Sequence, residues 1–202
     1  MIKTPSIGVM LALMMFPQIV ETIYSPALPH IALAFNVASN TAAQTLSIYF
    51  SAFALGVVFW GVAADYLGRR YSMLLGLVVY GVAAVGAMQC SQFETLLLMR
   101  ALSAFGAAVG SVVTQTMLRD SYDGARLAKV FGLMGIGISL SPVIGLMFGG
   151  VLVDTGGHKA VFLSLSIMAI ALFLLCLVSL PETKLAMKGN IHIVPLAKQM
   201  LA

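Results

Sequence analysis

Six apolar segments, each long enough to span a bilayer, constrain the fold of this chain more than any other feature of its sequence. About 20 apolar residues cross a hydrocarbon core of about 30 Å as a helix. Runs of this length lack the alternating pattern of a membrane β-barrel, so only the helix satisfies the backbone in lipid. We therefore predict an all-α integral membrane protein with six transmembrane helices. The segments cover approximately residues 7–27, 41–62, 71–90, 95–117, 129–152 and 160–180.

The composition agrees with a membrane protein and disfavours other classes. Of the 202 residues, 60% are hydrophobic and 9% are charged, whereas soluble domains carry about 25% charged residues. The net charge of +4 is small and the basic residues are scattered, so we predict no nucleic-acid partner. Cys90 and Cys176 lie in or beside apolar segments without a CxxC motif, and we interpret them as buried thiols.

No pattern in the sequence indicates an enzyme, a cofactor or a metal site. The motifs HExxH and GxSxG are absent from the sequence, and no two histidines stand at metal-ligand or haem spacing. His30, His158 and His192 lie outside the predicted spans in separate segments. We therefore predict that the protein is not an enzyme and binds neither a cofactor nor a metal.

Basic residues gather in alternate breaks between the spans. The breaks on the other side carry Lys159 and no further Lys or Arg. The positive-inside rule then places both termini in the cytoplasm, which agrees with an even number of spans. The basic residues of the inner breaks and the C-terminal segment are Arg69, Arg70, Arg119, Arg126, Lys129, Lys184, Lys188 and Lys198.

A cleaved signal peptide is the alternative interpretation of the N-terminus. Lys3, the apolar run over residues 7–20 and the small-residue stretch ALA at 32–34 fit that pattern. Cleavage would leave five spans and would put the C-terminus on the side opposite to the basic breaks.

Two ionisable residues, Glu21 and Arg100, lie well inside predicted spans. At 1.5 Å per residue both lie roughly 8–9 Å below the outer boundary, a common depth that allows a pair between neighbouring helices. Intramembrane charges usually face a cavity or a partner. We therefore predict that both residues belong to a cavity for a proton and a substrate.

Polar and small side chains recur at helical spacing around this pair. The alternative is that these Ser, Thr and Gln side chains only hold helices together. The residues predicted to line the cavity are Gln18, Glu21 and Ser25 in the first span, Gln44, Ser47 and Ser51 in the second, and Arg100, Ser103, Ser111 and Thr114 in the fourth.

The break after the second span, GVAADYLGRR at 61–70, carries a recognisable pattern. It resembles the G-x-x-x-D-x-x-G-R-R/K loop of the major facilitator superfamily. The resemblance implies a loop that controls conformational switching, with the Asp contacting a cytoplasmic Arg and a helix of a second half. An ordinary basic loop is the alternative, but it leaves the glycine and aspartate spacing unexplained. The matching residues are Gly61, Asp65, Gly68, Arg69 and Arg70.

The fourth and fifth spans carry weaker matches to the same family. LLLMRALSAFGAAVG, at 96–110, resembles a motif built around an Arg, here Arg100. GISLSPVIGLMFGG, at 137–150, resembles the fifth-span antiporter motif, which implies export, although a simple packing kink is the alternative. Ser141 and Leu146 stand where that motif has glycines. The residues taken as the antiporter-motif helix are Gly137, Ser141, Pro142 and Gly145.

Within the superfamily, the chain is most similar to the Bcr/CflA-type drug exporters. ETIYSPALPHIA resembles the end of their first span, and PET at 181–183 resembles the end of their sixth. Arg119 and Asp120 stand where these exporters carry Arg-Asp after the fourth span. The resemblance covers residues 7 to about 183.

The resemblance implies one half of a major facilitator fold, in which six helices form two inverted three-helix repeats. Residues 1–183 would be this half and residues 184–202 the start of a cytoplasmic linker. The implied function is proton-coupled export of small amphipathic drug-like molecules across a bacterial inner membrane by alternating access. Its partners are the bilayer, substrate, protons, and a missing C-terminal half or a second copy. A truncated remnant or scaffold and a half-size transporter active as a dimer are the alternatives.

Overall fold

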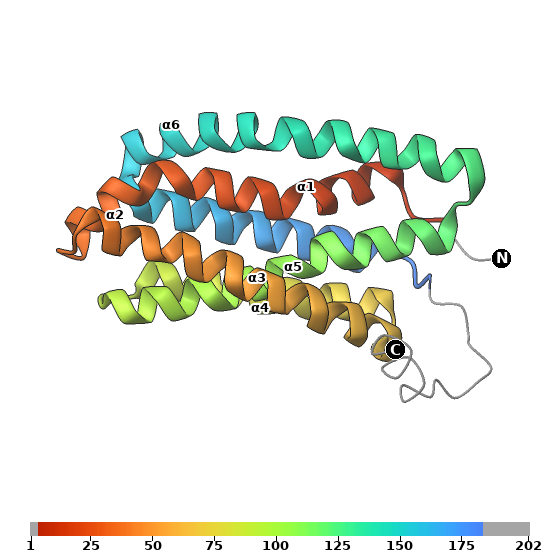
Figure 1. Ribbon diagram of the computed structural model, residues 1–202, viewed down its shortest axis with the longest axis horizontal. Helices are drawn as coiled ribbons and strands as arrows, with labels where there is room; N and C mark the ends of the chain where they lie inside the picture. The colour runs from red at the N-terminus through yellow and green to blue at the C-terminus, as the bar shows by residue number, and fades with distance from the viewer. Residues whose placement is uncertain (1–3, 184–202) are drawn as a thin grey trace, which may run out of the picture.

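The computed structural model describes residues 4–183, and these residues form helices joined by short turns (Figure 1). The predicted linker, residues 184–202, lies outside the described part. No strand occurs between residues 4 and 183. The elements are α1 (Ile7–Tyr24), the 3-10 turn η1 (Ser25–Ala27), α2 (Leu28–Ala34), α3 (Ser39–Leu67), α4 (Arg69–Gln89), α5 (Phe93–Ser121) and α6 (Gly124–Ser179).

The 56-residue helix α6 consists of two arms. Gly156 and Gly157 have non-helical backbone angles, and Gly157 has φ +62°, which favours glycine. The chain reverses at this end of the bundle, and the second arm runs back along it (Figure 1). The second arm packs on α4, where a Cβ on Gly81 would lie 3.4 Å from the Cβ of Ala169. Five helical stretches of the described chain are long and apolar enough to cross a membrane, and the last of them holds two of the predicted spans. The predicted all-α membrane architecture is confirmed.

Prolines shape the first span. Pro17 lies inside α1, and Pro26 and Pro29 occupy the first turns of η1 and α2. Pro26 and Pro29 are tolerated at these positions because the first amides of a helix have no intrahelical acceptor. The stretch from Ile7 to Ala34 therefore continues as one span of 28 residues with a tightened turn.

Helix α5 is the central packing element, because small residues let three neighbours approach its backbone. A Cβ on Gly106 would lie 2.5 Å from the backbone nitrogen of Tyr80 in α4, and one on Gly110 would lie 2.7 Å from the carbonyl oxygen of Leu13 in α1. On the third side, the indole Nε1 of Trp60 in α3 donates to the carbonyl of Phe105 over 2.8 Å. Arg100, the charged residue of α5 that lies well inside the span, is thereby held among α1, α3 and α4.

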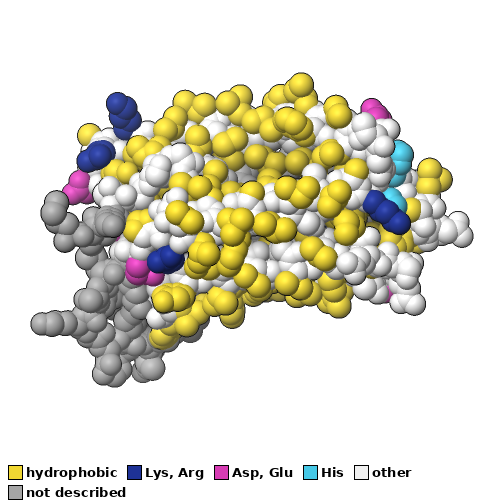
Figure 2. All heavy atoms as spheres, turned by 180° about the vertical axis from the view of Figure 1, so that it is seen from behind, with side chains coloured by type: hydrophobic (Ala, Val, Ile, Leu, Met, Phe, Trp, Pro, Cys, Tyr) yellow, Lys and Arg dark blue, Asp and Glu magenta, His cyan; other side chains and the backbone are white. Residues whose placement is uncertain are grey.

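The outer surface of the bundle is apolar between its two ends. Large Leu, Val, Ile and Phe side chains are exposed along α3, α4 and both arms of α6. In the view of Figure 2 the Lys, Arg, Asp, Glu and His side chains gather at the two ends, with a hydrophobic belt between them. This is the surface of a multi-pass membrane protein. The first and last described residues lie at the same end (Figure 1).

Candidate functional site

A cavity of about 210 Å³ opens between α1, α3, α5 and the first arm of α6. It brings together three residues predicted from the sequence, namely Gln18, Glu21 and Ser111. Glu21 is half-buried, and its carboxylate belongs to a wall that is otherwise mostly apolar. The cavity thus offers one acidic group and a few amide and hydroxyl groups among apolar side chains. The other lining residues are Met14, Pro17, Tyr49, Phe50, Phe53, Gln115 and Ile138.

Sequence reasoning missed two kinds of lining residue. Gln115 follows Ser111 by four residues, so helical spacing alone could have added it. The aromatic wall of Tyr49, Phe50 and Phe53 carries no such signal, because aromatic residues in an apolar segment are usual in a core or against lipid. The rotation of α3 about its own axis, which its packing on α5 determines, turns these rings toward the cavity.

Arg100 is buried beside this cavity, with 1% of its surface exposed. Its guanidinium carbon lies 3.7 Å from the centroid of the Tyr24 ring and 4.5 Å from that of Tyr49. Each desolvated cation–π contact of this kind stabilises by about 2 kcal/mol. Its Nε and one terminal nitrogen have no hydrogen-bond partner among the described residues.

The expected direct pair of Glu21 with Arg100 is not formed in this structure. No ion pair within 4 Å joins them in the described chain, although their charges attract across the gap. The two residues lie at neighbouring positions, as their common depth predicted, but Tyr24 and Tyr49 take the guanidinium. Aromatic faces replace the carboxylate as the partner of the cation.

Several predicted polar residues hydrogen-bond within their own helices. The hydroxyl of Ser103 donates to the carbonyl of Arg100 over 2.9 Å, and that of Ser25 donates to the carbonyl of Glu21 over 3.3 Å. Thr114 is fully buried, and its hydroxyl has no partner between residues 4 and 183. Back-bonding of this kind is ordinary for Ser and Thr in membrane helices. Ser103 and Thr114 do not line the cavity.

The predicted stripe of α3 points elsewhere. Gln44, Ser47 and Ser51 are exposed and do not line the cavity. The orientation of α3 follows from its packing on α5, where a Cβ on Gly56 would meet the carbonyl oxygen of Phe105 at 2.7 Å. That contact turns the neighbouring face, with Tyr49, toward the bundle and leaves the serine face outside.

The antiporter-motif helix packs closely on α1. A Cβ on Gly137 would meet Leu11 and Met15, and one on Gly145 would meet Thr22. Ser141, on the same face, is buried and donates its hydroxyl to the carbonyl of Gly137 over 2.8 Å. Pro142 is half-buried beside this face. Leu146 points to the surface with half of its area exposed, so the departure from the motif there does not disturb this contact.

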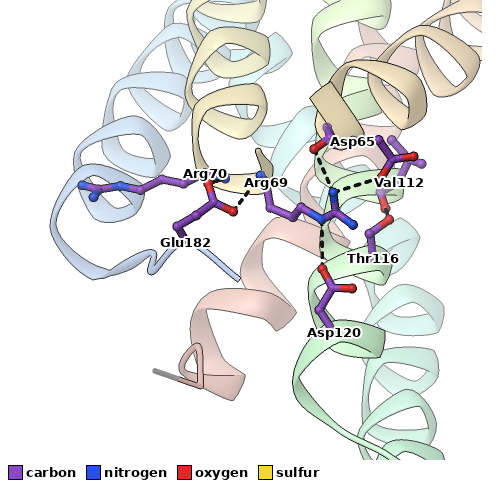
Figure 3. A network of polar contacts seen from close by, with 8 residues as sticks. Asp65, Arg69, Arg70, Val112, Thr116, Asp120 and Glu182 are labelled. Carbon is purple, nitrogen blue, oxygen red and sulfur yellow. Dashed lines mark hydrogen bonds and ion pairs between the residues drawn. The ribbon is translucent and has the colours of Figure 1, made fainter. Parts of the chain in front are cut away.

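The predicted switch loop forms a network of charged groups at one end of the bundle (Figure 3). The side chain of Arg69 donates from Nε to Asp120 and from a terminal nitrogen to Asp65, both over 2.9 Å. The same terminal nitrogen donates to the carbonyl of Ala64 over 2.8 Å. One guanidinium therefore joins the end of α3, the start of α4 and the end of α5.

Glu182, whose contact no sequence pattern predicted, completes this network. Its two carboxylate oxygens accept the backbone N–H groups of Arg69 and Arg70 over 2.9 and 3.1 Å, at the first turn of α4 (Figure 3). A carboxylate is stabilised there by the positive end of the helix dipole. Gly68 has φ +98° and ψ +159°, and a Cβ on it would lie 2.6 Å from Glu182. We call Asp65, Arg69, Asp120 and Glu182 the loop network.

The remaining predicted loop residues lie around this network with other contacts. Arg70 donates from its guanidinium to the carbonyl of Leu177 over 2.7 Å. Arg119 is exposed, and its guanidinium lies 6.0 Å from the ring centroid of Phe131. A Cβ on Gly61 would meet only the side chain of Val112 at 3.7 Å, an ordinary contact. Packing in this half therefore does not explain the glycine at 61.

Comparison with known proteins places this geometry in a family. The profile described as Major Facilitator Superfamily matches residues 10–197. The chain is 36% identical over 174 residues to an uncharacterized transporter of Rickettsia bellii, covering 86% of the chain and 43% of that protein. It is 28% identical to multidrug resistance protein D of Escherichia coli, covering 83% of the chain and 42% of the relative.

A solved structure shows the same fold. The human organic anion transporter MFSD10 superposes with a TM-score of 0.70 at 19% identity, over 88% of this chain and 47% of that one. The chain spans less than half the length of each of these proteins. Its six spans correspond to half of the fold.

Proposed function

Because the chain belongs to the Major Facilitator Superfamily, a family of transporters, we propose that it is the N-terminal six-helix half of a proton-coupled exporter of small amphipathic molecules. One observation carries this proposal. The cavity between α1, α3, α5 and α6 combines the carboxylate of Glu21 with aromatic and apolar walls, beside the buried cation of Arg100. The multidrug resistance protein among its relatives supports drug-like substrates.

In this proposal Glu21 carries the coupling proton. A carboxylate in a mostly apolar wall favours its protonated form, and a nearby cation favours its ionised form. A change in the distance between Glu21 and Arg100 therefore loads or unloads the proton. One charge crossing 100 mV supplies about 2.3 kcal/mol, enough to drive export against a concentration gradient of tens of fold.

The loop network stabilises one conformation of the transporter and must break when the transporter changes to another. It joins α3, α4 and α5 and the segment after α6 at one end of the bundle. We place this end at the cytoplasmic face of a bacterial inner membrane, because its breaks carry the excess of Lys and Arg. Both termini are then cytoplasmic, and further helices or a second copy would close the cavity.

The test is proton-driven efflux of ethidium, a fluorescent amphipathic cation, from everted membrane vesicles. An imposed pH gradient should drive ethidium uptake with the wild-type chain and none with Glu21→Gln. Asp154→Asn, which alters an exposed carboxylate at the turn of α6, is the matched control and should transport normally.

The assay is run on the chain alone and on the chain combined with a C-terminal six-helix half. Transport by the second preparation only would show that additional helices are required. Undiminished proton-driven uptake by Glu21→Gln in an active preparation would contradict the role given to this carboxylate.

A further inference from the structure

Tyr49 belongs to two sites at once. Its ring is part of the cavity wall that also contains Glu21. The same ring lies 4.5 Å from the guanidinium carbon of Arg100. The cation of Arg100 is therefore separated from the cavity by a single aromatic side chain.

The second ring at Arg100 is held more firmly. Tyr24 is fully buried, and its hydroxyl donates to that of Thr45 over 2.7 Å. Thr45 in turn donates to the carbonyl of Ala42 over 2.6 Å. The hydroxyl of Tyr49 makes a longer hydrogen bond, 3.3 Å, to the carbonyl of Pro17. Its ring contacts those of Phe50 and Phe53, with centroids 5.8 and 6.3 Å away, and these two rings also line the cavity. Of the two rings at Arg100, that of Tyr49 therefore belongs to the cavity wall and has the longer hydroxyl hydrogen bond.

Arg100 has unused hydrogen-bonding capacity. Its Nε and one terminal nitrogen are buried and have no partner among the described residues. A guanidinium held by ring faces alone gains from any acceptor that comes within reach. Glu21 is the acidic side chain on the neighbouring helix, and the two charges attract each other.

We propose that Tyr49 is a positioning residue that couples occupancy of the cavity to the proton on Glu21. In the empty cavity the ring of Tyr49 makes a cation–π contact with Arg100. An apolar molecule that packs on the aromatic wall of Tyr49, Phe50 and Phe53 shifts the Tyr49 ring, and the guanidinium then turns to Glu21. This inference rests on the proposed function and adds the element through which the substrate acts.

In this scheme, binding of the substrate and binding of the proton oppose each other, as an antiporter requires. A cation that moves toward a carboxylate favours its ionised form, so binding of the substrate releases the proton from Glu21. The substrate needs no charge of its own, because a stacking interaction moves the ring. A cavity of this kind therefore exchanges protons for uncharged aromatic molecules as well as for cations.

The other titratable groups around this site do not change that sign. Tyr24 in α1, Tyr49 in α3 and Tyr80 in α4 are buried phenols, and Arg100 in α5 is the buried cation. The part of α6 that reaches the cavity contributes Ile138, which does not titrate. Arg100 is thus the charged side chain that packs beside Glu21.

The test follows ionisation of Glu21 by isotope-edited infrared spectroscopy on the purified chain in lipid nanodiscs. Tyr49→Leu removes the ring and releases Arg100, so a larger fraction of Glu21 should be ionised at a given pH than in the wild type. Tyr49→Phe retains the ring and should titrate like the wild type. In an Arg100→Gln background, Tyr49→Leu should have no further effect.

A second arm uses chloramphenicol, an uncharged aromatic drug, and records protons released on its addition. Release by the wild type and Tyr49→Phe, with none from Tyr49→Leu, supports the proposal. Helical content is checked by circular dichroism, and Tyr49→Met replaces the Leu variant if that variant unfolds.

Two results overturn the inference. One is a titration of Glu21 that Tyr49→Leu leaves unchanged, and the other is an equal shift in the Arg100→Gln background. Failure of the proposed function gives a different result, because Glu21→Gln would then transport ethidium in response to the pH gradient whatever Tyr49 does.

Discussion

Two arginines in this bundle show opposite ways of holding a cation. Arg69, at the end of the bundle, donates to Asp65, Asp120 and the carbonyl of Ala64, and 12% of its side chain is exposed. Arg100, inside the membrane span, has two nitrogens without a partner among residues 4–183 and is held by the rings of Tyr24 and Tyr49. The first cation is fixed by directional hydrogen bonds, whereas the second is held by contacts that have little directional preference.

The two arginines mark where this half is rigid and where it can rearrange. Each hydrogen bond to a charged group stabilises by about 1.5–3 kcal/mol and requires a defined geometry. A cation–π contact tolerates sliding of the ring over the guanidinium. The loop network therefore acts as a structural joint, and Arg100 as a group that can change partners.

The largest effect should follow removal of the fixed cation. Arg69→Met leaves Asp120 and Asp65 without their partner, so we expect the free energy of unfolding to fall by about 2–3 kcal/mol. The measurement is denaturant unfolding in detergent micelles, followed by far-ultraviolet circular dichroism. Arg126→Met, at an exposed arginine near the ring of Tyr122, is the control and should change stability by less than about 0.5 kcal/mol. Equal stability of the two variants would contradict the role of Arg69 as a joint.

The backbone at Gly68 should give the next largest effect. Its dihedral angles fall in a region that is nearly restricted to glycine, and an added Cβ would displace Glu182. We expect Gly68→Ala to cost about 1–3 kcal/mol in the same unfolding assay. Gly132→Ala, in α6 with nothing within 4 Å of its added Cβ, should be neutral or slightly stabilising. If both alanines behave alike, the contact with Glu182 does not constrain the loop.

A smaller effect is expected from the charge of Glu182. Glu182→Gln keeps an acceptor for one amide of α4 but loses the favourable interaction with its positive end, so we expect a loss of about 0.5–1 kcal/mol. Because Glu182 is exposed, this loss should shrink as the salt concentration rises. Asp154→Asn, an exposed acid of α6, supplies the control. A loss that is unaffected by salt would show that shape, rather than charge, makes the contribution.

The smallest effect on stability should come from Arg100, in contrast to Arg69. Arg100→Met removes a buried charge whose nitrogens Nε and one Nη have no partner in the described part of the chain. The desolvation cost that this charge carries offsets the two cation–π contacts that are lost, and exchanges of buried ions for apolar side chains are often neutral or stabilising. We expect a change within about 1 kcal/mol in unfolding free energy. A loss as large as that of Arg69→Met would mean that the two arginines are held equally firmly, and the distinction between them would fall.

The sequence predicted what depends on length and on local spacing. Six apolar runs indicated the spans. Glu21 lies in a cavity wall with Gln18, as their separation of three residues suggested. These features depend on helical periodicity, which any single segment displays.

Features that depend on the rotation of one helix against another were beyond the sequence. The polar face of α3 at Ser47 and Ser51 lies outside, because Gly56 packs against α5. The same rotation brings Tyr49 to Arg100, so a ring occupies the place expected for Glu21. The stretch PET at 181–183 indicated the end of the last span, but the contact of Glu182 with α4 joins segments more than 100 residues apart, and no local pattern encodes it. The roles of the predicted site residues in transport stay predictions.

The contact between α1 and the first arm of α6 has a mechanical consequence. Gly137, Gly145 and Gly149 present bare backbone to α1, and an added Cβ on Gly149 would lie 2.5 Å from the carbonyl oxygen of Ile23. At these three positions the backbone of α6, rather than a side chain, forms the contact. Two helices in such contact slide past each other with little repacking, as in shear motions between packed segments. Helix α1, which carries Glu21, can therefore shift along α6. Such a shift changes the shape of the cavity.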